Sequence, residues 1–355
     1  MSQENQNIQE EPHKRRVRYK GKYPRNYKEK YKELNPEKYQ DTIEKVIRKG
    51  STPAGMHISI MVREIIDFLK IKPGQTGFDA TLGYGGHTKA MLECLKGQGH
   101  MYATDVDPIE SAKTKKRLAD AGFGEDILTI RLQNFCTIDE IAKEAGGFDF
   151  VLADLGVSSM QIDNPDRGFS FKVDGPLDLR LNPEKGISAA ERLAQIDEDE
   201  LAGMLWENSD EPYAEELAHA IVNERKHGKP IDTTTRLREV IEETLSFLPE
   251  KEKKDTVKKT CQRTFQALRI DVNNEFEVLY EFMEKLPGAL KPGGRAAILT
   301  FHSGEDKLVK KALKQGYKEG VYSEIANDVV RPSAEECAQN GRARSTKMRW
   351  AVRAE

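Results

Sequence analysis

The sequence contains no long hydrophobic run and no closely spaced cysteine pair. No apolar stretch approaches the roughly 20 residues of a membrane-spanning helix, and residues 1–11 are too polar for a signal peptide. The four cysteines lie far apart, which indicates neither a CxxC zinc site nor a disulfide framework. We therefore expect reduced cysteines in a cytoplasmic protein without a metal site. The 355 residues, 37% hydrophobic and 32% charged, suffice for about two globular domains.

Charge is distributed unevenly along the chain. Residues 1–50 hold 14 Lys and Arg against 8 Asp and Glu, a net charge of +6, whereas the remainder has a net charge of −9. Tyrosine recurs within this segment at every fourth position: Tyr19, Tyr23, Tyr27 and Tyr31. Basic residues with interleaved aromatic rings suit phosphate attraction and base stacking. The alternative is a flexible, solvated N-terminal arm with no partner.

Hydrophobic periodicity predicts alternating strands and helices between residues 60 and 155. The predicted helices span 60–69, 87–96, 108–121 and 137–145. The predicted strands span 76–80, 99–105, 127–133 and 148–155. Such an alternation is typical of a parallel sheet with helical crossovers.

The alternation stops for 138 residues, from residue 156 to residue 293. A fifth strand is predicted at 294–300, after the turn Lys291-Pro292-Gly293-Gly294, and a final strand at 346–353. The intervening segment has helical periodicity at 212–227, 234–247 and 264–286. We therefore expect an α/β domain with a mostly parallel, doubly wound sheet, formed by residues 51–160 and 264–355. Residues 161–263 would form an inserted helical domain.

A glycine-rich turn, residues 79–87, joins the first predicted strand to its helix. Gly85 and Gly86 allow a ligand to approach the backbone, and the helix that begins near His87 offers free N–H groups to an anion. Thr88 occupies the third glycine position of the dinucleotide fingerprint, which disfavours a nicotinamide cofactor.

Three acids end the first, second and fourth predicted strands: Asp79, Asp105 and Asp154. The ends of parallel strands line one crevice, where Asp105 is placed to accept hydrogen bonds from both ribose hydroxyls of a nucleoside. Together with the glycine-rich turn, this pattern indicates S-adenosylmethionine. No GxxxxGK[ST] loop is present, which disfavours phosphoryl transfer.

At these motifs the sequence resembles a known family. The matching runs are GGH from Gly85, DLGVSS from Asp154, RGFSF from Arg167, DGPLD from Asp174, RTFQALRI from Arg263, FHS from Phe301 and RARS from Arg342. They resemble the bacterial small-subunit ribosomal RNA cytidine-N4 methyltransferases (RsmH, formerly MraW), over roughly residues 56–353. The resemblance implies a class I (Rossmann-like) methyltransferase fold.

The resemblance also implies the cofactor contacts. These carry over to Gly85, Gly86, His87, Asp105, Phe135, Asp154 and Gln161. Phe135 would pack on the adenine, although a core phenylalanine is an equal alternative from its position alone. Gln161 would hydrogen-bond the adenosyl or methionyl end.

The implied reaction is N4-methylation of a cytidine in the decoding (P-site) region of 16S ribosomal RNA, within the small subunit or its precursor. Asp154, or a carbonyl or hydroxyl group in 155–159, is the candidate acceptor of an N4 hydrogen; the alternative is that Asp154 serves only the cofactor. The alternatives are methylation of another RNA or DNA base and a non-catalytic role in RNA binding or ribosome assembly. The sequence leaves the oligomeric state open, a homodimer included.

Residues outside the cofactor motifs are expected to contact RNA. Loop 163–180 is expected to cover the pocket, with Arg167 and Arg180 near phosphate or base and Phe169 or Phe171 stacking. The alternative is that these rings only dock the loop onto the insertion. Basic residues in 251–263 and 342–353 would add phosphate contacts.

Three features depart from the family's usual pattern. The family commonly has His-Pro-Ala before RTFQA, but this sequence has Lys259-Thr260-Cys261-Gln262. The family's FHSLEDR run is changed here by Gly304 and Lys307. The basic N-terminal arm is an addition to the family pattern. They suggest a divergent, second copy of the enzyme.

Overall fold

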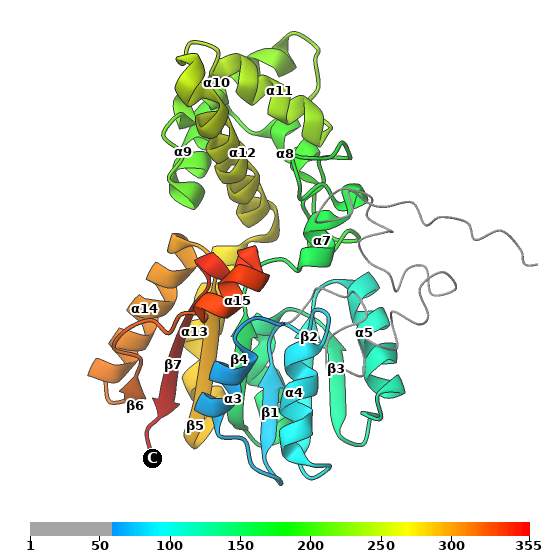
Figure 1. The fold of residues 1–355 in the computed structure, drawn as a ribbon, viewed down its shortest axis with the longest axis vertical. Coiled ribbons are helices and arrows are strands. Elements are labelled where there is room, and N and C mark those ends of the chain that lie inside the picture. Colours follow the sequence, from blue (N-terminus) through cyan, green and yellow to red (C-terminus); the bar gives the residue numbers. More distant parts are fainter. Residues whose placement is uncertain (1–58) are drawn as a thin grey trace, which may run out of the picture. The chain divides into compact units, whose positions relative to one another are not determined.

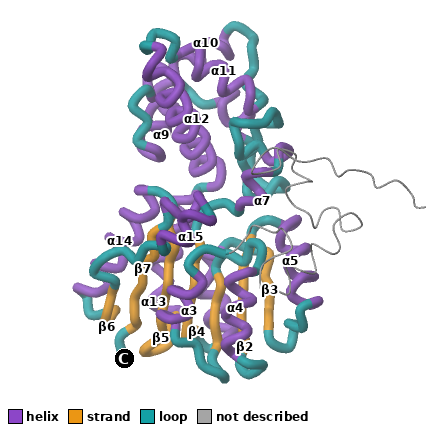
Figure 2. The backbone as a smooth tube through the Cα atoms, viewed as in Figure 1, coloured by secondary structure: helices purple, strands orange, loops and turns teal. Residues whose placement is uncertain are grey.

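The computed structural model describes residues 59–355 (Figures 1 and 2). The predicted basic arm, residues 1–50, lies outside the described residues. The described part contains a seven-stranded sheet with the strand order β3-β2-β1-β4-β5-β7-β6. Its strands are β1 (Thr76–Asp79), β2 (His100–Asp105), β3 (Leu128–Leu132), β4 (Phe148–Asp154), β5 (Leu290–Thr300), β6 (Tyr322–Ile325) and β7 (Lys347–Arg353). Only β7 runs antiparallel to its neighbours, so the predicted mostly parallel sheet is confirmed.

Helices cover both faces of the sheet, as a doubly wound fold requires. One face packs against α3 (Val62–Leu69), α4 (Gly86–Leu95) and α5 (Pro108–Asp120). The other packs against α6 (Ile138–Ala145), α13 (Glu275–Ala289) and α14 (Ser303–Lys318). Strand β4 is buried along almost its whole length because both layers cover it.

Two predicted boundaries are wrong. The fifth strand begins at Leu290 rather than 294, because a register shift opposite Phe148 and Phe150 absorbs the Pro-Gly-Gly segment as a bulge. The predicted helix 264–286 is two helices, since Asn274 has a left-handed backbone (φ 49°) that ends α12 (Glu250–Asn273) and precedes α13. The sequence analysis also missed α14 and β6.

The long segment between β4 and β5 is helical. It contains α7 (Ser159–Asp163), α8 (Ala189–Gln195), α9 (Glu198–Ser209), α10 (Ala214–Lys226), α11 (Thr234–Thr244) and α12. Figure 1 shows α9–α12 gathered in a bundle beyond the sheet. Residues between Phe169 and Leu268 form a hydrophobic core of their own. Residues 334–345 add α15 (Ala334–Gln339) and a short 3₁₀ turn (Gly341–Ser345) before β7. No helix among residues 59–355 is both long and apolar enough to cross a bilayer.

Candidate active site at the carboxyl ends of the strands

A cavity of about 550 Å³ opens where the parallel strands end. One wall consists of the loops that follow β1, β2, β3 and β4. The opposite wall comes from α12, α13 and the start of α14, so the helical segment and the sheet share the cavity. Of the seven predicted site residues, all line it: Gly85, Gly86, His87, Asp105, Phe135, Asp154 and Gln161.

The glycine-rich turn requires its glycines for steric reasons. Gly85 is the N-cap of α4 at φ 83°, and a Cβ there would lie 2.7 Å from Cγ2 of Thr114. A Cβ at Gly86 would lie 2.0 Å from Oγ of Ser59. The backbone of this turn therefore stays open toward the cavity at the N-terminus of a helix.

Asp105 lies at the end of β2 and braces the same turn. Its Oδ2 accepts a hydrogen bond from the Gly83 N–H at 2.8 Å, and its Oδ1 accepts one from the Asp107 N–H at 2.9 Å. Burial raises the pKa of Asp105 to about 6. A carboxylate can accept about four hydrogen bonds, so it has capacity for two hydroxyl groups.

Asp79, the first of the three strand-end acids, does not line the cavity. It is fully buried and accepts hydrogen bonds from Thr81 N–H at 3.0 Å and Thr88 Oγ1 at 2.6 Å. Its burial raises its pKa. The inclusion of Asp79 in the site was therefore wrong. Its carboxylate stabilises the strand-to-helix turn through Thr81 and Thr88 and does not contact the cavity.

Asp154 and His87 lie side by side in the cavity lining. His87 Nδ1 lies 3.4 Å from Asp154 Oδ2, while His87 Nε2 lies 2.9 Å from the Ile60 carbonyl oxygen. The Oδ1 atom of Asp154 has no hydrogen-bond partner within residues 59–355. Burial raises the pKa of Asp154 to about 6, although the His87 ring lowers it in part.

Phe135 and Gln161 occupy the two sides of the cavity. Phe135 is half-buried and meets Phe282 edge to face at 5.2 Å, so it belongs to the core periphery as well as to the cavity wall. Gln161 lies in α7, where its side chain and that of Ser158 form a capping box. Its Nε2 donates to Asp107 Oδ2 at 2.8 Å.

Loop 163–180 is held by a buried ion pair. Arg167 Nη1 donates to Asp107 Oδ2 at 2.7 Å, and both side chains are buried. Arg167 Nη2 donates to the carbonyl groups of Arg180 and Leu181 at 3.1 and 2.8 Å. Phe169 is buried in the helical core, and Phe171 packs against that core. The structure thus favours the docking alternative over RNA contact by Arg167 and the two rings.

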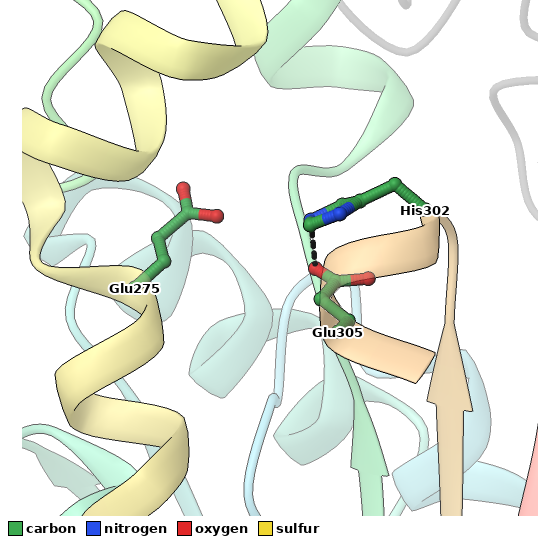
Figure 3. Close-up of side chains that lie close together, drawn as sticks. All are labelled: Glu275, His302 and Glu305. Carbon is green, nitrogen blue, oxygen red and sulfur yellow. Dashed lines mark ion pairs between the residues drawn. The ribbon is translucent and has the colours of Figure 1, made fainter. Parts of the chain in front are cut away.

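A polar cluster that the sequence analysis did not assign lines the cavity at the start of α13 and α14. Figure 3 shows Glu275 and His302 facing one another across a gap, with Glu305 beneath the ring. His302 Nε2 lies 3.1 Å from Glu305 Oε1, and Glu305 Oε2 accepts the Phe301 N–H at 2.8 Å. Although burial opposes it, the His302 contact and the nearby Arg269 guanidinium hold the pKa of Glu305 below its usual value.

The spacing of Glu275, His302 and Glu305 would suit a metal ion, because one ligand atom from each lies within 4.8 Å of the others. However, Arg269 donates to both oxygens of Glu275 at 2.8 Å. A guanidinium bound to one of the three ligands repels a cation, so the arrangement is better suited to polar contact with a substrate. Arg269 belongs to the RTFQALRI run that the sequence analysis singled out. Its ion pair with Glu275, on the other side of the helix break at Asn274, could not be predicted from the sequence.

The sequence matches the MraW methylase family over residues 54–354. The chain belongs to this family. The ribosomal RNA small subunit methyltransferase H 1 of Agathobacter rectalis is 82% identical, and the alignment covers 98% of this chain and 99% of the relative. Methyltransferase H 2 of Alkaliphilus metalliredigens is 63% identical over 97% of this chain and 99% of that protein.

A more distant member of the family also aligns with most of the chain. Methyltransferase H of Thioalkalivibrio sulfidiphilus is 37% identical, and the alignment covers 85% of this chain and 98% of that protein. Membership of the MraW methylase family makes the chain an S-adenosylmethionine-dependent methyltransferase. The resemblance noted in the sequence motifs is thereby confirmed.

Proposed function

We propose that this methyltransferase transfers a methyl group from S-adenosylmethionine to N4 of a cytidine in the decoding (P-site) region of 16S ribosomal RNA. The names of its relatives specify the small-subunit ribosomal RNA as their substrate. The observation that carries the proposal is the cavity that joins the glycine-rich turn to a polar wall built from α12 and α13. A cavity of this kind has room for a nucleoside cofactor beside an extruded base. Because the proposed substrate is ribosomal RNA, we place the enzyme in the cytoplasm.

In this proposal the cofactor binds along the ends of β1, β2 and β3. The open backbone at Gly85, Gly86 and His87 faces the methionyl part, and Asp105 accepts the ribose hydroxyls with its two free lone-pair positions. Phe135 packs on the adenine with the face that Phe282 leaves uncovered. Gln161 keeps Ser158 and Asp107 in place beside the adenosyl group.

The target cytosine enters from the side of the helical segment. The bound cofactor supplies an electrophilic methyl group on a sulfonium. The residues of the cavity would hold N4 in line with this methyl group and accept the one proton that N4 releases on methylation. Asp154 is the proposed acceptor, because its carboxyl group lines the cavity, where 27% of the side chain is exposed. The amide of Gln262 on α12 is available for the base edge, whereas Gln266 Nε2 donates to the Asn208 carbonyl at 3.4 Å and leaves only its Oε1 for the base.

We further propose that residues 161–263 form an RNA-recognition domain. The first half of α12 carries five lysines on a mostly exposed surface: Lys251, Lys253, Lys254, Lys258 and Lys259. Such a row of charges attracts the phosphate backbone without reading sequence. Arg342 pairs with Asp163 at 3.1 Å at the cavity mouth and would meet RNA there.

The proposal is tested by transfer of radiolabelled methyl groups to small ribosomal subunits that lack the modification, followed by nucleoside analysis of the RNA. We expect label in N4-methylcytidine with the wild-type enzyme and with the exposed control Asp120→Asn, and a large loss with Asp154→Asn. Label in another nucleoside or in DNA, or no label at all, would reject the proposed activity.

A further inference from the structure

The His87 side chain has a defined proton arrangement. It is nine-tenths buried and lies at the start of α4. Its Nε2 lies 2.9 Å from the Ile60 carbonyl oxygen, which can only accept a hydrogen bond. Nε2 therefore carries a hydrogen, and a neutral His87 presents a lone pair at Nδ1 to Asp154.

The contact between His87 Nδ1 and Asp154 Oδ2, at 3.4 Å, then requires a shared proton to be attractive. If neither group were protonated at this contact, two lone pairs would face each other. We propose that His87 and Asp154 share one proton, and that His87 is the positioning residue that keeps Asp154 ready to accept the N4 proton. This inference rests on the proposed function and deepens it.

The other charged groups around the pair are acidic. Asp79 from β1 and Glu305 from α14 both act electrostatically on Asp154. Both raise the pKa of Asp154, as does its burial, whereas His87 is the group that lowers it. Arg269 is paired with Glu275 and acts on Glu305. Protonated His87 thus offsets the charges of Asp154 and Asp79, whereas His302 and Arg269 act on Glu305.

This arrangement accounts for the proton in the reaction. When N4 bonds to the methyl carbon and the S–C electron pair stays on sulfur, N4 holds one proton in excess. That proton passes to the Asp154 carboxylate, and the pair afterwards returns a proton to water. The rate should therefore increase with pH as Asp154 becomes ionised, and the position of this increase should depend on His87.

The first test is the pH–rate profile of single-turnover methyl transfer, at saturating cofactor, for the wild type and His87→Gln. A glutamine amide can still donate to the Ile60 carbonyl but cannot carry the proton. We expect the rising limb to move to higher pH in His87→Gln, with the rate at pH 6 falling more than the rate at pH 8.5. His219→Gln is the matched control, because His219 forms an exposed pair with Glu198 at 2.9 Å, and its profile should equal that of the wild type.

A uniform loss of rate at every pH, with the limb unmoved, would mean that His87 has only a structural role and would overturn the inference. Wild-type enzyme that forms no N4-methylcytidine would instead reject the proposed function. In either case a second measurement tests the shared proton directly: an NMR spectrum of the His87 ring nitrogens in the full chain. We expect a hydrogen-bonded proton on Nδ1 in the wild type that is absent from Asp154→Asn, and an identical spectrum for the two proteins would refute the sharing.

Discussion

The buried pair of Arg167 and Asp107 gives the most demanding test of how the cavity is held together. Asp107 is fully buried, and Arg167 is 7% exposed. Arg167 connects the carboxylate beside the cofactor site to the main chain at Arg180 and Leu181. Leu181 N–H in turn donates to Asn273 Oδ1 at 2.7 Å, which ties the loop to the end of α12.

Replacing Arg167 with methionine keeps much of the side-chain volume but leaves the Asp107 charge buried. Removal of one partner of a buried ion pair costs about 3–5 kcal/mol. Asp107 keeps hydrogen bonds from Gln161 and from the N–H groups of Ile109 and Glu110, so we expect the lower end of that range. A loss of about 3 kcal/mol corresponds to a change of roughly a hundredfold in the unfolding equilibrium constant.

The assay is equilibrium unfolding in urea, followed by circular dichroism. The matched control is Arg131→Met, because Arg131 pairs with Glu144 on the surface, with 43% and 52% of their side chains exposed. That change should cost less than about 1 kcal/mol. The double variant Asp107→Asn with Arg167→Met should recover part of the loss, since no charge then remains buried. If Arg167→Met cost no more than Arg131→Met, the reasoning about this pair would be wrong.

Three further predictions concern the cofactor, pH and the N-terminal arm. Asp105→Ala should weaken S-adenosylmethionine binding at least about tenfold, because hydrogen bonds to charged groups contribute about 1.5–3 kcal/mol each; unchanged calorimetric affinity would remove its ribose role. Because the folded-state pKa of Asp154 is raised from 3.8 to about 6, its ionisation destabilises the folded protein as pH rises through that interval. Asp154→Asn should therefore gain roughly 1–3 kcal/mol over the wild type between pH 4 and pH 7 in urea titrations, and a difference independent of pH would contradict this. Deletion of residues 1–50 should leave cofactor affinity unchanged but lower RNA affinity and flatten its salt dependence, whereas an identical salt slope would assign the arm no phosphate contacts.

The sheet was predictable because its strands and helices have regular periodicity. Strands β1 to β4 and helices α3 to α6 lie within two residues of their predicted bounds. The register shift in β5 was not predictable, because it depends on how Phe148 and Phe150 pair across the sheet. The helix break at Asn274 was also missed. The hydrophobic periodicity continues through this residue and predicts one helix, whereas the left-handed backbone of Asn274 ends α12.

Site residues that directly follow strands could be predicted from the sequence. Pairs between residues far apart in the sequence could not. Asp105 and Asp154 end parallel strands, so their position at one edge follows from topology. Asp79 has the same signal but is turned away by Thr81 and Thr88, which only the packing decides. The role of Arg167 depends on a partner 60 residues earlier in the chain, a distance at which sequence pattern carries no information.

The central claim is that one cavity at the carboxyl ends of the strands holds the cofactor beside the target base. The most direct measurement is a crystal structure of the protein with S-adenosylhomocysteine. The account predicts ribose hydroxyls on Asp105, adenine against Phe135 and the sulfur facing Asp154. Electron density for the ligand at any other place, with these three side chains uncontacted, would contradict it.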